Sequence, residues 1–226
     1  MKTFGHRGAA GLVAENTLAS ISRAIELGVD GIEIDVHCCK SGELVVIHDD
    51  SVDRTTNGVG LIKNLTLTEL KELSIDGKYS IPALTEVLDI IDAQCQLNIE
   101  LKGSGTALPV VDLLREYLNN SGWDKSDFII SSFDHDQLFD VCSIDNTLKI
   151  GVLTEEKIAD ALMIAKSLKA YSIHPSIEKF EAEEALLAIE EGFTIYVWTV
   201  NDKSEIDRLS RLNVEAIITD FPNFVL

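Results

Sequence analysis

The sequence predicts an α/β protein built as a closed (β/α)₈ barrel of the TIM type. Short β-rich runs alternate with helical patterns along the whole chain. There are eight such runs, and a helix or a loop separates each from the next. Several runs are almost continuously apolar, as in 195–198. Strands that alternate with helices pair in parallel, and parallel strands are buried on both faces. Eight such strands are the number that closes a barrel.

The eight predicted strands are 2–5, 31–36, 96–101, 128–131, 148–152, 170–173, 194–199 and 216–219. Between them, apolar residues recur at helical spacing, for example at Leu18, Ile21 and Ile25. Four residues each follow a helical pattern and precede a strand, where a left-handed residue closes a helix. They are Gly28, Gly122, Gly192 and Asn213.

Two irregularities modify the simple barrel within what we expect to be a single domain, 1–226. The stretch 37–82 is too long for a βα loop. It holds a further β-run at 43–48, a turn at 56–58 and a short helix at 68–73 with a capping box between Thr66 and Glu69, so it predicts a small insertion over the barrel mouth. Few residues follow 219, so the last outer helix is absent or abbreviated, which hints at a homo-oligomer contact there. An open, doubly wound sheet is the alternative fold.

Composition excludes several classes of function. The net charge of −19 and the pI near 4.5 argue against binding to nucleic acid or to an anionic membrane surface. No segment is apolar enough to span a membrane, and no amphipathic membrane element is found, so we expect no stable membrane association. Four cysteines without C-x-x-C spacing indicate free thiols in a reducing compartment. The first residues lack an apolar leader, and a functional His6 could not survive cleavage of one, so the expected location is cytoplasmic.

Three carboxylates stand at the ends of neighbouring strands. Glu33 and Asp35 are two residues apart, so their side chains share one strand face, with Cα atoms about 6.6 Å apart. Glu100 ends the next barrel strand. Carboxylates without cysteine or histidine among them suit a hard divalent cation, Mg²⁺ or Ca²⁺. Solvated strand-end charges are the competing explanation.

Two histidines and two cations stand at similar positions. His6 and Arg7 follow the first strand, where active sites of barrels form. His48 ends the β-run of the insertion. Two imidazoles can serve as base and acid in one reaction cycle, and the arginine fork suits a phosphate. Lys102 shares a strand face with Glu100 and could contact phosphate, form a salt bridge to that glutamate, or both.

Other polar residues carry weaker signals. Glu15 opens the first helix and could line the site, although capping by Asn16 or Thr17 is the simpler explanation of the segment. Trp198 could line the mouth of the barrel or belong to its core. The remaining histidines are interpreted as structural: His37, His135 and His174.

These elements together resemble the glycerophosphodiester phosphodiesterase family, in its small cytoplasmic bacterial form. The matching segments occur in the family's order over nearly the whole chain: His6-Arg7-Gly8, Glu15-Asn16-Thr17, Gly31–Val36, Val45–Asp49, Arg54–Gly58, Ile81–Leu84, Ile99–Lys102 and Thr219–Pro222. The resemblance implies catalysis by the two histidines, a divalent ion on the three carboxylates, and phosphate contacts from the arginine and the lysine. The chain departs from the family at 37–40 and in its abbreviated C-terminus.

The expected reaction is hydrolysis of a small-molecule glycerophosphodiester, such as glycerophosphocholine or glycerophosphoethanolamine, to glycerol 3-phosphate and an alcohol. Which histidine is the base stays open, as does attack by water or first by the glycerol 2-hydroxyl. The alternatives are a lysophospholipase D-like enzyme and a non-catalytic phosphate-binding barrel. An unrelated barrel lyase or aldolase would need a Schiff-base lysine or an enolate-stabilising set instead.

Overall fold

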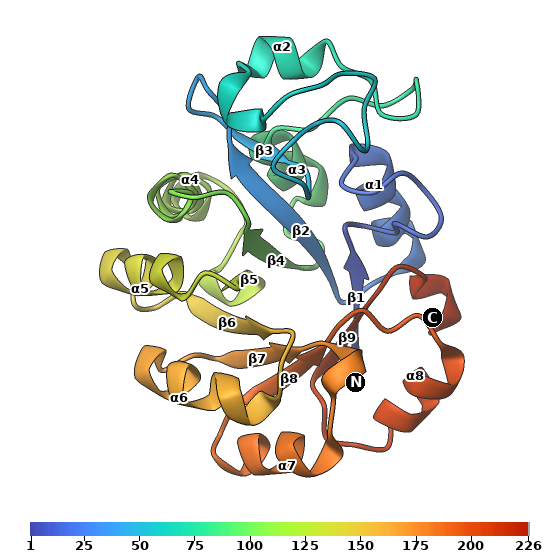
Figure 1. Ribbon diagram of the computed structural model, residues 1–226, viewed down its shortest axis with the longest axis vertical. Coiled ribbons are helices and arrows are strands. Elements are labelled where there is room, and N and C mark those ends of the chain that lie inside the picture. Colours follow the sequence, from blue (N-terminus) through green and yellow to red (C-terminus); the bar gives the residue numbers. More distant parts are fainter. Residues whose placement is uncertain (226) are drawn as a thin grey trace.

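The computed structural model describes residues 1–225 and contains a closed barrel of eight parallel strands (Figure 1). The order in the sheet is β1-β9-β8-β7-β6-β5-β4-β2, and a β1–β2 pairing closes it. The barrel prediction is confirmed, and the open doubly wound alternative is wrong because such a sheet has two free edges. The strands are β1 (Lys2–His6), β2 (Gly31–Cys38), β4 (Gln96–Leu101), β5 (Phe128–Ser132), β6 (Lys149–Thr154), β7 (Ser172–Pro175), β8 (Thr194–Val197) and β9 (Ala216–Thr219).

Helices cover the outside of the barrel, and their apolar faces pack on the outer faces of the strands (Figure 1). After β9 only the 3₁₀ turn η4 (Pro222–Phe224) follows within the described residues, as the abbreviated C-terminus predicts. None of the helices over residues 1–225 is both long and apolar enough to cross a membrane. The outer helices are α1 (Leu18–Leu27), α3 (Leu84–Ile91), α4 (Ala107–Asn120), α5 (His135–Ile144), α6 (Ile158–Leu168), α7 (Ala182–Glu190) and α8 (Lys203–Leu209), and two further 3₁₀ turns are η2 (Lys125–Asp127) and η3 (Ile177–Lys179).

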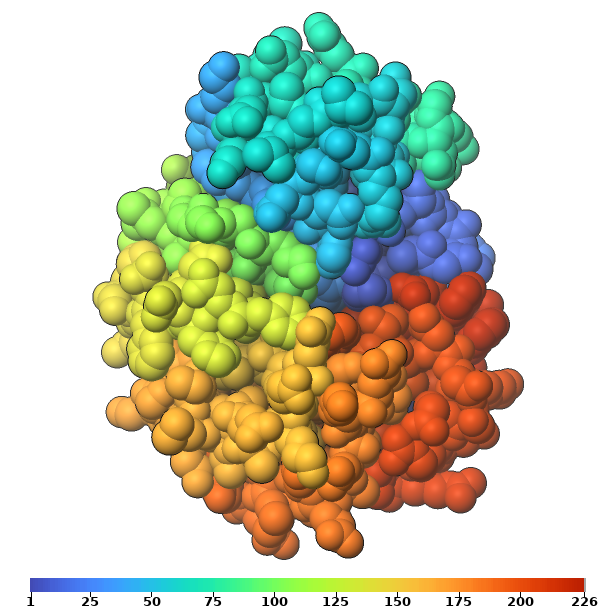
Figure 2. Space-filling model, in the orientation of Figure 1, coloured from blue at the N-terminus to red at the C-terminus, as the bar shows by residue number. Residues whose placement is uncertain are grey.

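The segment between β2 and α3 stands above the barrel, as the turquoise region of Figure 2 shows. It contains β3 (Leu44–Val46), which pairs antiparallel with β2, then η1 (Ile62–Asn64) and α2 (Leu67–Lys71). The expected capping box of Thr66 and Glu69 is present. The segment has an apolar cluster of its own, which includes Val52 and Leu70, so it packs as a small unit beside the main core.

Only two of the four expected helix-closing residues are left-handed. Gly28 and Gly192 have φ of 80° and 96°. Gly122 and Asn213 do not, because α4 and α8 end earlier, with Ser121 extended and Ser210 still helical at the cap positions. Left-handed Asp92 and Lys169 close α3 and α6 instead. Asp and Lys at these positions are not the residues that normally mark a helix end, so the sequence pattern did not reveal them.

Candidate active site

Three buried carboxylates meet where β2 and β4 run side by side. Glu33, Asp35 and Glu100 are at most 8% exposed, and each offers an oxygen within 4.8 Å of the others. Asp35 and Glu100 are register partners in the sheet. Burial, and then the charge of Asp35, raises the pKa of Glu33 and raises that of Glu100 to about 7. Mutual repulsion in a dry site is the condition that a bound cation relieves.

The donor set fits a hard divalent cation. Among the described residues, these three form the group of acidic, histidine or cysteine side chains close enough to share an ion. Within the described residues, a buried oxygen of Glu33 lacks a hydrogen-bond partner, and Oε1 of Glu100 has the ammonium of Lys102 beside it at 3.0 Å. All the donors are carboxylate oxygens, which Mg²⁺ and Ca²⁺ prefer. The sequence prediction of this cluster therefore agrees with the geometry.

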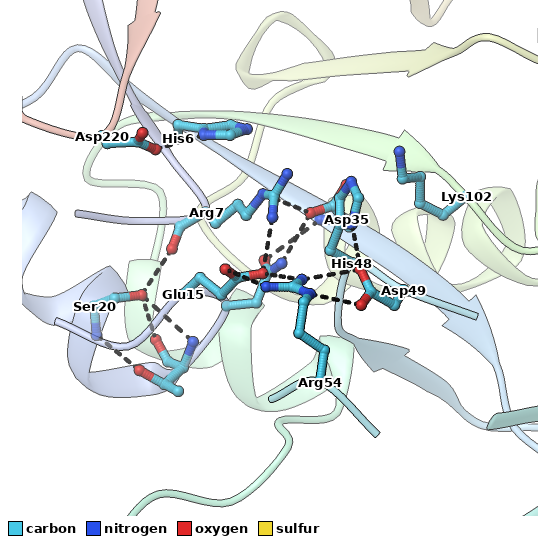
Figure 3. Close-up of polar contacts among 12 residues, drawn as sticks. His6, Arg7, Glu15, Ser20, Asp35, His48, Asp49, Arg54, Lys102 and Asp220 are labelled. Atoms are coloured by element: carbon cyan, nitrogen blue, oxygen red, sulfur yellow. Dashed lines mark hydrogen bonds and ion pairs between the residues drawn. The ribbon is translucent and has the colours of Figure 1, made fainter. Parts of the chain in front are cut away.

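The loop after β1 places Arg7 over the acidic cluster. Arg7 takes a left-handed conformation with φ of 52°, and its backbone N–H donates to Glu33 at 3.0 Å. Its guanidinium donates through Nη1 to Glu15 at 2.8 Å, and its Nε lies 3.4 Å from Asp35 (Figure 3). Burial opposes the charge of Arg7, but Asp35, Glu33 and Glu15 raise its pKa. Within residues 1–225, Nη2 of Arg7 makes no hydrogen bond to a carboxylate, so it remains available to an anion.

The segment 15–17 has one role for each residue. Thr17 caps α1, with its hydroxyl accepting from the backbone N–H of Ser20. Asn16, buried and left-handed, donates to Asp35 at 2.8 Å. Glu15 pairs with Arg7, so it supports the site from the side. The sequence prediction that a simple cap explains the segment is thus correct for Thr17 and incomplete for its two neighbours.

His6 is held by a carboxylate from the last strand of the barrel. Its Nδ1 lies 2.6 Å from Oδ1 of Asp220, which follows β9 (Figure 3). Asn201 donates to the other oxygen of Asp220 at 2.5 Å and accepts from its backbone N–H. Although burial opposes ionisation, the hydrogen bond from His6 lowers the pKa of Asp220. The Nε2 of His6 lies 3.9 Å from Glu33 and faces the acidic cluster.

His48 has a carboxylate partner too, but this carboxylate is also bonded to a cationic side chain. Its Nδ1 lies 2.7 Å from Asp49. Asp49 is also gripped by Arg54, whose Nε donates to it at 2.6 Å. The hydrogen bond from Arg54 lowers the pKa of Asp49. Burial lowers the pKa of His48 itself.

Lys102 lies beside the cluster and forms the salt bridge to Glu100 that one of its two interpretations predicted. Its Nζ is 3.0 Å from Glu100 and 5.5 Å from the ring centre of Phe133. Burial disfavours its charge, but Glu100 and Asp35 raise its pKa. The ammonium is therefore charged and lines the cavity.

A cavity of about 160 Å³ connects these groups. An adjoining cavity of about 370 Å³ shares His48, Glu100, Lys102 and Phe133 with it and extends to His37. Trp198 stacks edge-on against Phe133 at 5.6 Å and so lines the mouth, as one of its two interpretations predicted. The smaller cavity is lined by His6, Arg7, Glu33, His48, Asn98, Glu100, Lys102, Phe133, Leu153, Glu155, Trp198 and Ile218.

Sequence reasoning missed the residues that support the histidines and part of the lining. Asp49 and Asp220 belong to the motifs that carry the family resemblance, but no role was predicted for them. Asn201 and Phe133 belong to no motif, so the sequence pattern does not indicate that they lie at the site. His37, interpreted as structural, lines the adjoining cavity and lies 3.1 Å from the backbone oxygen of His48. The prediction of a structural role fits the other two histidines better. His174 is fully buried and stacks on Tyr196. His135 begins α5 and lines neither of the two cavities.

The mouth of this TIM barrel brings together two histidine–carboxylate pairs, the cationic side chains of Arg7 and Lys102, and a cluster of three carboxylates. This combination is that of a phosphate-ester hydrolase. A sequence profile of the glycerophosphoryl diester phosphodiesterase family matches residues 6–224. The chain therefore belongs to the glycerophosphoryl diester phosphodiesterase family.

Relatives of known sequence and structure agree with this membership. The chain is 38% identical, over its whole length and 97% of the relative, to a glycerophosphodiester phosphodiesterase of Caldanaerobacter subterraneus subsp. tengcongensis. A phosphodiesterase of Oleispira antarctica, solved in complex with the product sn-glycerol-3-phosphate, superposes with a TM-score of 0.89 at 29% identity, covering 98% of this chain and 94% of that one. A glycerophosphodiester phosphodiesterase of Thermotoga maritima gives a TM-score of 0.83 at 30% identity over 100% and 96%.

Proposed function

We propose that this protein hydrolyses glycerophosphodiesters to glycerol 3-phosphate and an alcohol such as choline or ethanolamine. The observation that carries the proposal is the meeting of two imidazoles, each with its own carboxylate, at one cavity that also holds a buried acidic cluster. Family membership and the relative solved with sn-glycerol-3-phosphate give the substrate class.

A divalent cation, Mg²⁺ or Ca²⁺, would be held by Glu33, Asp35 and Glu100. When bound, it supplies positive charge to the phosphate oxygens and so makes the phosphorus more open to attack. Arg7 offers Nη2 and Lys102 its ammonium to the same phosphate, and both side chains line the cavity. These contacts neutralise the diester and orient it.

The two histidines divide the proton transfers. His48, whose pKa burial lowers, takes the proton of the attacking hydroxyl as that oxygen bonds to phosphorus. His6, whose Nδ1 is bonded to Asp220 and whose Nε2 faces Glu33, passes a proton to the alcohol oxygen as the bond from phosphorus to that oxygen breaks. Each ring uses Nδ1 for its carboxylate, so Nε2 is the nitrogen that exchanges protons with the substrate.

We also propose that residues 1–226 act as one catalytic domain in which 37–82 is an insertion. The proposed catalytic groups come from β1, from the insertion and from the loop after β9, so the site needs both ends of the barrel sequence as well as the insertion. A cytoplasmic location, supported by four free cysteines, belongs to the same proposal.

The test is release of glycerol 3-phosphate from glycerophosphocholine in a coupled dehydrogenase assay, with EDTA, Mg²⁺ or Ca²⁺. We expect release that EDTA stops and one of the cations restores. Release of phosphatidic-type products from lysophospholipids alone would replace the proposal with a lysophospholipase D-like activity. Binding of glycerol 3-phosphate without turnover of any diester would replace it with a phosphate-binding barrel.

A further inference from the structure

Arg54 reaches from the insertion to the barrel and grips two carboxylates at once. Its Nε and Nη2 donate to Asp49 at 2.6 and 2.9 Å, and its Nη1 and Nη2 donate to Glu15 at 3.0 and 2.8 Å. Asp49 lies on the insertion, whereas Glu15 lies in the loop that follows β1. One guanidinium therefore joins the two walls of the site (Figure 3).

Each gripped carboxylate holds a group of the proposed mechanism. Asp49 lies 2.7 Å from Nδ1 of His48. Glu15 accepts from Nη1 of Arg7 at 2.8 Å. Arg54 is thus one side chain away from both the histidine and the phosphate-binding arginine, although it is absent from the lining of the central cavity.

Arg54 is not arranged to bind substrate. A guanidinium has five N–H groups, and four of them are used in the contacts to Asp49 and Glu15. Its side chain is 47% exposed on the outer side of these carboxylates. A planar guanidinium that spends most of its N–H groups on two carboxylates fixes their relative position, which arginine does better than lysine.

Arg54 is not needed to attach the insertion. The insertion is already held by the β2–β3 ladder, by a bond from the backbone N–H of Ile47 to the carbonyl of Asp35, and by its own apolar cluster. Without Arg54 the folded insertion would remain in place. Glu15 and Asp49, however, would be left as like charges facing each other.

We infer that Arg54 is a positioning residue, which clamps Asp49 to Glu15 and so holds His48 and Arg7 in register with each other. This inference rests on the proposed function for the roles of those two residues. Turnover therefore depends on the contact that Arg54 makes between the insertion and the loop after β1. Folding of the chain and binding of the cation do not depend on that contact. Misplacement of a catalytic group by about 1 Å can cost about 100-fold in rate.

The experiment compares Arg54→Gln and Arg54→Lys with Arg23→Gln. Arg23 is a matched control because it is similarly exposed and, within residues 1–225, pairs with Glu26 on its own helix. For both Arg54 variants we expect kcat to fall about 10- to 100-fold, with KM changed far less and with the wild-type melting temperature and cation affinity. Lysine should restore little, because a single ammonium cannot serve both carboxylates with two parallel bonds.

A double-mutant cycle tests the route of the effect. In an Asp49→Asn background, Arg54→Gln should cost much less than it costs alone, since one arm of the clamp is already lost. Full additivity, or wild-type kcat in both Arg54 variants, would overturn the inference.

A readout without substrate separates this inference from the proposed function. In histidine side-chain NMR spectra, Arg54→Gln should change the Nδ1 signals of His48, assigned by comparison with His48→Ala, and Arg23→Gln should not. If the wild-type protein cleaves no glycerophosphodiester but this shift occurs, the proposed reaction fails and the clamp stands. An unchanged His48 signal rejects the clamp whichever reaction the protein catalyses.

Discussion

At the residue scale, the two histidines of the site are distinguished by what stands behind their carboxylates. Asp220 is held by the neutral amide of Asn201 and keeps its full charge toward His6. Asp49 is bonded by the guanidinium of Arg54 as well as by His48, so a cation shares its negative charge. Burial lowers the pKa of His48, so a neutral ring that can accept a proton is favoured there. The division of proton transfers proposed above rests on this difference in surroundings.

Removal of either ring should stop most of the turnover. We expect His6→Ala and His48→Ala each to lower kcat by about 10²- to 10⁴-fold, because each removes one proton transfer from the transition state. Steady-state kinetics on glycerophosphocholine measure this, with His135→Ala, outside both cavities, as the control. Full rates in both variants would contradict the division of proton transfers.

Glu100→Gln should separate the effect of the acidic cluster on cation affinity from its effect on thermal stability. The substitution removes a cation ligand, so cation affinity should fall by at least about 10-fold, as outer contacts alone are worth that much. It also removes a buried like charge, so the chelator-treated protein should melt at a higher temperature than the wild type. Calorimetric titration and thermal melts give the two numbers, with exposed Glu116→Gln on α4 as the control. Unchanged cation affinity would take Glu100 out of the ligand set.

At the element scale, the loop between β1 and α1 depends on a glycine that no other residue can replace. Gly8 has φ of 86°, and a Cβ there would lie 2.4 Å from Oγ of Ser20. That hydroxyl donates to the carbonyl of Arg7 at 2.8 Å, so the loop rests directly on the first turn of the helix. The position of Arg7 over the acidic cluster follows from this close approach.

Gly8→Ala and Gly28→Ala should therefore differ. Both glycines are left-handed, but a Cβ on Gly28 would meet no atom within 4 Å. We expect Gly28→Ala to cost about 1–2 kcal/mol of unfolding free energy and to leave kcat unchanged. Gly8→Ala should cost more and should also lower kcat. Denaturant melts and kinetics on the same samples test this, and equal behaviour of the two variants would show that crowding against Ser20 is unimportant.

Helices and strands could be predicted from the sequence where the residues that determine their ends lie next to those ends. The bounds of β4 and β9 agree with the sequence pattern, since apolar runs end at turn residues there. The left-handed closures at Asp92 and Lys169 escaped prediction, because tertiary packing and not residue preference sets them. In the same way, period two placed Glu33 and Asp35 on one face, whereas Asp220 beside His6 required the closed barrel.

At the scale of the whole molecule, the acidic cluster links stability to pH and to cations. The folded state raises the pKa of Glu100 from 4.5 to about 7 and also raises that of Glu33. Between those pH values the folded chain binds more protons than the unfolded chain, so stability falls as the pH rises. A bound cation needs the ionised carboxylates and should reverse this trend.

Thermal melts should reveal the reversal. With EDTA, we expect this cluster to lower the melting temperature as the pH rises from about 5 to about 8. With saturating Mg²⁺ or Ca²⁺, the melting temperature should exceed that in EDTA, and this difference should grow as the pH rises over the same range. Glu100→Gln should flatten both trends, and a cation effect that is equal at the two pH values would contradict the coupling.

The pair of His6 and Asp220 joins residues 214 positions apart, one at the end of the first strand and the other just after the last strand of the barrel. During synthesis the N-terminal strand leaves the ribosome long before its partner exists. A nascent chain therefore cannot complete this dyad until β9 has emerged and closed the barrel. Chains that end before residue 220 lack the carboxylate partner of His6, so under the proposed mechanism they should be unable to cleave phosphodiesters at the rate of the full chain.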